Sequence, residues 1–201
     1  MDAEITRSRL KLHCDIDKWH KSQVGHFPAL QSLISEAQHV DPELEPLFLP
    51  SHFPTVSQRQ KLGLYDLGLK EMELRRGEAN DALDSVRLCI KQLSVNLAFK
   101  KKEIRGQRDN TRAQSILKSG IRERDKHMQK YREAQAAMIR LGMAPDNTTY
   151  RPLHDTDLWM KGIVEGHVLG DGRREESWIW KTGFGTTPSD ASRTEWEKDG
   201  A

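Results

Sequence analysis

The chain has little of what a membrane span, an export signal or a large buried core requires. Its 201 residues are 36% hydrophobic and only 6% aromatic, and no run of about 18 apolar residues occurs among them. The opening stretch MDAEITRSRL lacks the apolar segment of a secretory signal. We therefore predict a soluble intracellular protein with no membrane partner.

Residue types that build catalytic or metal sites do not occur in the spacings that such sites need. The two cysteines, Cys14 and Cys89, lie 75 positions apart and outside any CxxC pair, which excludes a disulfide scaffold and argues against zinc. The eight histidines include no i, i+4 pair, and no serine lies in a GxSxG turn. We expect no catalytic residue, no metal site, no cofactor and no small-molecule substrate.

Residues 1–40 have the apolar spacing of helices. Pro28 predicts a stop or kink between Gly25 and Pro28, because proline removes a backbone donor, and a shorter helix should follow. The predicted apolar faces are Ile5, Leu12, Ile16 and Trp19 in the first helix, and Leu30, Leu33 and Ile34 in the second. Residues 41–54 then hold four prolines, which predicts an extended connector.

A long helix is predicted over about 57–105. It starts after Thr55, whose spacing to Gln58 is typical of a capping box. Steps of three and four residues from Leu62 give eleven positions, of which ten are apolar and Arg76 is the exception. These positions form a predicted packing seam, which comprises Leu62, Tyr65, Leu69, Met72, Arg76, Ala79, Leu83, Val86, Ile90, Leu93 and Leu97.

The opposite side of this helix also carries apolar residues, namely Leu64, Leu67, Leu74, Leu88, Val95 and Phe99. A two-stranded coiled coil would keep that side polar, so we expect a helix packed between two neighbours. Gly63, Gly68 and Gly77 each cost about 1 kcal/mol relative to alanine inside a helix. The first turns should therefore be its weakest part.

A second long helix is predicted over about 111–141. Thr111 and Gln114 repeat the capping spacing, and Gly142 followed by Pro145 marks the end. We therefore predict an all-α fold, in which an antiparallel helical hairpin over 55–142 has the N-terminal helix packed alongside. Residues 143–201 form an irregular tail that holds four of the five tryptophans, so it should dock on the hairpin or on a missing partner.

The net charge of +2 hides a basic cluster around the predicted hairpin turn. Twelve Lys and Arg between Lys100 and Arg132 stand against five acids counted to Glu133, which leaves about +7 there and about −5 elsewhere. Such a cluster can follow phosphates without reading sequence. The other interpretation is a solvated face laced with Arg/Glu pairs, since no aromatic residues interleave with the basic ones. Weak, non-specific DNA contacts would come from Lys100, Lys101, Lys102, Arg105, Arg108 and Arg112.

Several motifs occur in a fixed order along nearly the whole chain. They are LHCDIDKW at 12–19, LFLPS at 47–51, GQxxNTR at 106–112, YREA at 131–134 and SWIW at 177–180. In this order and spacing they resemble the C-terminal helical region of Kyakuja-Dileera-Zisupton (KDZ) transposases, which are abundant in fungal genomes.

The resemblance implies a module that lies outside the RNase H-like catalytic core of those enzymes, since no motif here matches that core or its acidic metal-binding residues. We expect a non-catalytic, truncated remnant that acts in the nucleus in scaffolding, dimerisation or non-specific DNA contact. Its partners would be DNA, a second copy or the missing core. The alternative is a free-standing helical module for protein–protein interaction. An active enzyme would need converging carboxylates on a rigid core.

Overall fold

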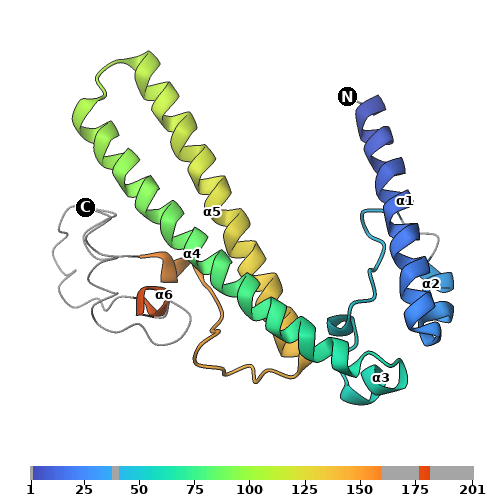
Figure 1. Cartoon of the computed structure of the whole chain (residues 1–201). Helices are drawn as coiled ribbons and strands as arrows, with labels where there is room; N and C mark the ends of the chain where they lie inside the picture. The colour runs from blue at the N-terminus through green and yellow to red at the C-terminus, as the bar shows by residue number, and fades with distance from the viewer. Residues whose placement is uncertain (1, 38–40, 160–176, 182–201) are drawn as a thin grey trace. The chain divides into compact units, whose positions relative to one another are not determined.

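The computed structural model describes residues 2–37, 41–159 and 177–181, and every regular element in these ranges is a helix (Figure 1). The α-helices are α1 (Asp2–His26), α2 (Gln31–Ala37), α3 (Val56–Lys61), α4 (Tyr65–Glu103), α5 (Gln107–Leu141) and α6 (Trp178–Lys181). The 3-10 helices are η1 (Pro28–Leu30), η2 (Pro50–His52) and η3 (Asp155–Leu158). The all-α prediction is therefore confirmed.

The chain divides into two compact units. The N-terminal unit comprises residues 1–74 and 137–144, and the hairpin unit comprises residues 75–136 and 145–201. In the hairpin unit, α4 and α5 run antiparallel side by side, as predicted (Figure 1). Its buried apolar residues include Ala79, Leu83, Val86 and Ile90 on α4, and Met128, Tyr131 and Ala134 on α5.

Both long helices begin at positions other than those predicted. The expected helix over 57–105 is divided, because Gly63 adopts a φ of +73° between the end of α3 at Lys61 and the start of α4 at Tyr65. The capping box of Thr55 and Gln58 is confirmed, but it starts only the short α3. The second helix starts at Gln107 and not at 111.

Two local hydrogen-bond patterns define the ends of α5. The Thr111 hydroxyl donates to Gln107 O over 2.9 Å, so Thr111 lies inside the helix and does not cap it. The predicted glycine end is confirmed, since Gly142 has a φ of +116° and Met143 N donates to Met138 O over 2.9 Å. This bond and that of Gly142 N to Ile139 O over 3.0 Å form a Schellman motif.

The prediction that α4 is buried on two sides is wrong for the described residues. On the side away from the seam, the exposed fractions are 39% for Leu67, 74% for Leu74, 56% for Leu88, 64% for Val95 and 59% for Phe99. Leu64 is buried, but it precedes α4. The physical reason is that apolar periodicity shows which residues could be buried and not how many neighbours the helix has.

The N-terminal unit has its own small core. The predicted break at Pro28 is confirmed, and a cluster of buried side chains follows it, comprising Leu30, Ile34, Phe48, Phe53 and Leu64. The connector is more than extended chain, because it contains η2 and contributes Phe48 and Phe53 to that core. The predicted apolar face of α1 is largely wrong, since Ile16 is buried whereas Ile5, Leu12 and Trp19 are 50%, 39% and 42% exposed.

The described part of the tail docks within the hairpin unit. Ile179 of α6 is fully buried, and its carbonyl accepts a hydrogen bond from Arg87 Nε on α4 over 2.6 Å. The rings of Trp178 and Tyr131 lie 6.0 Å apart between centroids. Of the two docking surfaces that the tryptophan content suggested, the hairpin is the one observed for these residues. Trp196 lies outside the described residues.

Candidate functional site

The predicted DNA-contact residues lie at the end of the hairpin where the chain turns from α4 into α5, which we call the hairpin tip (Figure 1). The lysines at 100–102 occupy the last turn of α4. Arg105 lies in the turn, and Arg108 and Arg112 lie in the first turns of α5. The turn therefore brings all six cationic side chains to one end of the hairpin unit.

Helix electrostatics explains only part of this cluster. Lysines in the last turn of α4 lie at the negative end of the helix dipole, where a cation stabilises the helix. Arg108 has the opposite placement, because the first turn of α5 is the positive end of its dipole. Asp109 beside it suits that end. The position of Arg108 therefore does not serve helix stability.

Few ion pairs neutralise the tip. In the described ranges, the pair found there joins Lys102 Nζ to Glu103 Oε1 over 3.6 Å. Farther along α5, Arg124 pairs with Asp125 over 2.7 Å and Lys126 pairs with Glu123 over 3.1 Å, and this hydrogen bond from Lys126 lowers the pKa of Glu123. Arg124 and Lys126 therefore fit the interpretation of a face laced with ion pairs, whereas the positive charge of the tip is only weakly compensated.

A hollow of about 360 Å³ lies between the helix ends at the tip. Its lining residues are Asn96, Phe99, Glu103, Ile104, Asp109, Arg112, Ala113 and Ile116. Two carboxylates against one guanidinium make this hollow a poor site for an anion. Contacts with phosphates would instead come from the exposed side chains around it.

The seam residues differ in their burial. Leu83, Val86 and Ile90 are buried, and Met72, Leu93 and Leu97 are half-buried. Leu69 is 56% exposed, and Leu62 lies in the turn before α4. The buried part of the predicted seam is therefore the middle of α4, and the first two seam residues of that helix are exposed.

A second cavity of about 480 Å³ explains the partial burial at the end of the seam. Its lining is mostly apolar and includes Ile90, Leu93 and Leu97 of α4, Leu117 and Ile121 of α5, and Leu158 and Trp159. Each polar side chain on the wall already has a partner. Ser94 donates to Lys91 O over 2.7 Å, and Asp155 accepts from Arg132 over 3.2 Å. The third, Arg124, bonds Asp125, so the cavity offers apolar surface and little to orient a ligand.

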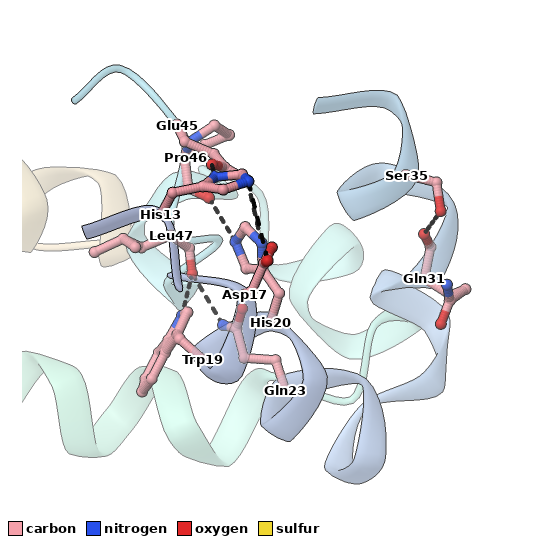
Figure 2. A network of polar contacts seen from close by, with 10 residues as sticks. All are labelled: His13, Asp17, Trp19, His20, Gln23, Gln31, Ser35, Glu45, Pro46 and Leu47. Atoms are coloured by element: carbon pink, nitrogen blue, oxygen red, sulfur yellow. Dashed lines mark hydrogen bonds and ion pairs between the residues drawn. The ribbon is translucent and has the colours of Figure 1, made fainter. Parts of the chain in front are cut away.

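Sequence reasoning missed a polar network that joins α1 to the connector in the N-terminal unit (Figure 2). The Glu45 side chain is 2% exposed, and its two oxygens lie 3.4 Å from His20 Nδ1 and 3.8 Å from His13 Nδ1. His20 Nε2 lies 3.1 Å from Pro46 O, and it donates because a carbonyl can only accept. A buried carboxylate therefore meets two imidazoles.

Neighbouring side chains of α1 bind the backbone of the same connector. Trp19 Nε1 and Gln23 Nε2 donate to Leu47 O over 3.0 Å and 2.9 Å (Figure 2). Gln23 Nε2 also donates to Phe48 O over 3.3 Å. Phe48 has a φ of +48°, a backbone conformation that side-chain-bearing residues rarely adopt. The signal that could have identified this face is the helical spacing of Ile16, His20 and Gln23.

A third network in the N-terminal unit surrounds the end of α5. The Arg59 guanidinium donates to Phe53 O over 2.6 Å and to Arg140 O and Leu141 O over 3.2 Å each. Arg140 Nε donates to Ser51 O over 3.0 Å. These carbonyls of Arg140 and Leu141 belong to the last turn of α5, which leaves them without helical partners. Arg59 therefore caps a helix that lies 81 positions further along the chain.

Buried ionisable groups in the hairpin unit also bind backbone carbonyls. Burial lowers the pKa of Arg87, and Asp84, which accepts a hydrogen bond from it, opposes that shift. Burial raises the pKa of Tyr131, whose hydroxyl donates to Arg151 O over 2.7 Å. Burial also raises the pKa of Cys89. The hydrogen bonds from Arg87 to Ile179 O and from Tyr131 to Arg151 O hold segments of the unit together, and we interpret both as structural contacts.

The described residues contain no cluster of three or more His, Cys, Asp or Glu side chains that could hold a metal ion. Among these residues, helices that combine the length and the apolar character needed to span a bilayer are also absent. No family model, curated protein or solved structure matches the chain.

Proposed function

We propose that this chain is a non-catalytic helical scaffold of KDZ-transposase origin whose hairpin tip makes non-specific contacts with the phosphates of DNA. The observation that carries the proposal is the exposed, weakly compensated charge of the tip. Arg108 is the most informative residue, because its position at the positive end of α5 is unfavourable until an anion approaches. A nuclear location follows from the same origin.

The motifs behind the resemblance support a structural role. Tyr131 and Ala134 of the YREA motif are fully buried in the hairpin unit. Trp178, Ile179 and Trp180 of the SWIW motif form α6 together with Lys181, and Ile179 is the buried residue of that helix. Gly106 and Gln107 of the GQxxNTR motif mark the turn into α5. These residues build the scaffold, as expected if what the family shares here is packing.

The proposal is tested by binding of a labelled duplex DNA at low salt, measured by fluorescence anisotropy. Reversing four charges at the tip, by Lys100→Glu, Lys101→Glu, Lys102→Glu and Arg105→Glu, should weaken binding by at least about 100-fold. Wild-type affinity should fall steeply with salt, with a slope of about −0.9 per phosphate contact. Absence of wild-type binding at low salt would refute the DNA contact.

A matched control separates the tip from total charge. Arg7, Lys11 and Lys21 on α1 are exposed basic residues, and a variant with glutamate at these three positions changes the net charge almost as much. It should retain most of the wild-type affinity. Equal loss in both variants would mean that binding follows net charge alone.

A second candidate function, protein–protein interaction, is favoured by the exposed apolar residues of α4 in the hairpin unit. Leu88, Val95 and Phe99 are each more than half exposed. Such a row can form a contact with a second copy or a partner helix. Sedimentation equilibrium distinguishes the two functions, because Leu88→Gln with Val95→Gln should dissociate an oligomer without changing DNA affinity. A wild-type monomer at every concentration would remove self-association.

A further inference from the structure

A line of basic side chains extends beyond the hairpin tip along the outward face of α5. At 3.6 residues per turn, its members lie within about 40° of one line along the helix, and all are exposed. We call them the α5 basic row, which comprises Arg108, Arg112, Arg122, Lys126 and Lys130. Ser115 and Ser119 fall in the gap between Arg112 and Arg122 on the same line.

The row lies on the side of α5 opposite its packed face. The buried residues Ala113, Met128 and Tyr131 are turned by about 140–200° from the row around the helix. The helix is therefore divided into an apolar side that packs in the hairpin unit and a basic side that faces outward. The basic side makes none of the apolar contacts of the packed side, so folding does not require its side chains to be basic.

Acidic residues are displaced from the row. Three acids lie between Gln107 and Lys130, namely Asp109, Glu123 and Asp125, and they are turned by about 60–100° to either side of the row. Lys126 pairs with Glu123, and Arg124 pairs with Asp125. Glu133 is the first acid on the line itself, and Gln129 Nε2 donates to it over 2.9 Å. Within the described residues, Arg108, Arg112, Arg122 and Lys130 make no ion pair.

The length and chemistry of the row fit a duplex. From Arg108 to Lys130 it spans about 33 Å at about 1.5 Å per residue, which is close to one turn of double-stranded DNA at about 34 Å. The row holds arginine, lysine and serine, all of which bind phosphate oxygens, and no aromatic side chain on which an unpaired base could stack.

We propose that the α5 basic row is a phosphate-contact surface for double-stranded DNA, which extends the contact from the hairpin tip along about one helical turn of the duplex. This inference rests on the proposed function and adds Arg122, Lys126 and Lys130 to the contact surface. The row lacks groups arranged to read base edges, so it binds without sequence preference.

The test uses the full chain and a labelled duplex of about 20 base pairs at low salt. Neutralising the far end of the row, by Arg122→Gln, Lys126→Gln and Lys130→Gln, should weaken binding by at least about tenfold. It should also reduce the slope of log affinity against log salt by about three, at about 0.9 per lost contact. The matched control replaces Arg7, Lys11 and Lys21 with glutamine and should leave both quantities near the wild-type values.

The outcomes separate this inference from the proposed function. If the row variant binds like the wild type while the tip variant does not bind, the row is refuted and the tip contact stands. Equal loss in the row variant and the control refutes the row as a surface. Tighter binding of single-stranded DNA or duplex RNA than of duplex DNA refutes the assigned partner.

A second measurement tests the row in the unaltered protein. It complements the variant with Arg122→Gln, Lys126→Gln and Lys130→Gln, whose helical circular dichroism signal should equal that of the wild type because the three side chains are exposed. Lysine acetylation of the wild-type chain, read by mass spectrometry, should then show Lys126 and Lys130 protected when the duplex is present. The control residues Lys11 and Lys21 should react equally in its presence and absence, and unprotected row lysines would overturn the inference.

Discussion

Arg59 lies where neither a lysine nor a leucine could replace it. The residue is 3% exposed, and its planar guanidinium donates to three carbonyls that belong to two segments of the chain. A lysine ammonium presents one point of contact, and a leucine would leave the carbonyls of Arg140 and Leu141 without a donor. The stability of the N-terminal unit therefore depends on a buried guanidinium whose hydrogen-bond partners are backbone carbonyls.

Replacing Arg59 should destabilise the protein more than any exposed arginine. Arg59→Met keeps apolar volume but leaves three carbonyls unpaired, which should cost on the order of 3 kcal/mol of unfolding free energy in urea denaturation. Arg7→Met is the matched control on exposed α1 and should change the free energy by less than about 0.5 kcal/mol. Equal changes in unfolding free energy for the two variants would show that the hydrogen bonds of Arg59 to the three carbonyls do not stabilise the fold.

The two cysteines should differ in reactivity for a reason that is visible at each thiol. Cys14 is exposed, whereas burial raises the pKa of the half-buried Cys89 and the nearby Glu123 raises it further. Because the thiolate is the nucleophile, Cys14 should react faster with a thiol reagent at neutral pH, by at least about tenfold. Alkylation of Cys14→Ser and Cys89→Ser variants measures each thiol alone. Faster labelling of Cys89 would contradict its burial.

At the element scale, two glycines of the long helices have opposite roles. Gly77 lies inside α4 with nothing within 4 Å of the position a Cβ would take, so it weakens the helix without serving a contact. Gly142 ends α5 at a φ of +116°, which a side chain disfavours. Helix boundaries in this chain are therefore defined by backbone conformation, and glycine is needed at only one of these two positions.

Alanine at these two positions should have opposite effects. Gly77→Ala should stabilise the protein by about 0.5–1 kcal/mol, because alanine has the higher helix propensity. Gly142→Ala should destabilise it by about 1 kcal/mol, because it strains the Schellman motif. Thermal unfolding of the two variants gives the sign of each change. Destabilisation by Gly77→Ala would mean that an additional contact occupies that face.

At the scale of the whole molecule, long-range contacts through backbone carbonyls hold remote segments together. Arg87 and Ile179 lie 92 positions apart and share one of the shortest of these bonds. Tyr131 similarly reaches Arg151 O, and Arg132 Nε donates to Leu153 O over 3.0 Å. A chain with limited apolar content thus attaches its irregular segments to the hairpin with polar side chains.

Loss of the Arg87 contact should release α6 without unfolding the hairpin. Arg87→Gln removes the bond to Ile179 O, so hydrogen exchange over residues 177–181 should accelerate by about tenfold, which corresponds to about 1.4 kcal/mol. Exchange in the middle of α5 should not change. Arg122→Gln, on the exposed face of the same unit, is the control. Unchanged protection of 177–181 would show that Trp178 and Ile179 hold α6 alone.

Local sequence patterns predicted the helical content and several helix limits correctly, because those limits depend on contacts between nearby residues. The capping box at Thr55, the break at Pro28 and the end at Gly142 each involve residues within five positions of one another. The basic cluster at the hairpin tip was also predicted, since the charged residues can be counted directly in the sequence. The start of α5 was predicted wrongly because Gln107 lacks the side chain of a typical N-cap.

Which helix faces are covered depends on contacts that form only in the folded chain. Leu74 and Val95 have the apolar spacing of buried residues and are exposed, whereas Glu45 is polar and buried. Burial depends on how many neighbours an element has and on partners far along the chain, and a local pattern contains neither. The same holds for the charges, because the turn between α4 and α5 brings the cations of two helix ends together at the tip.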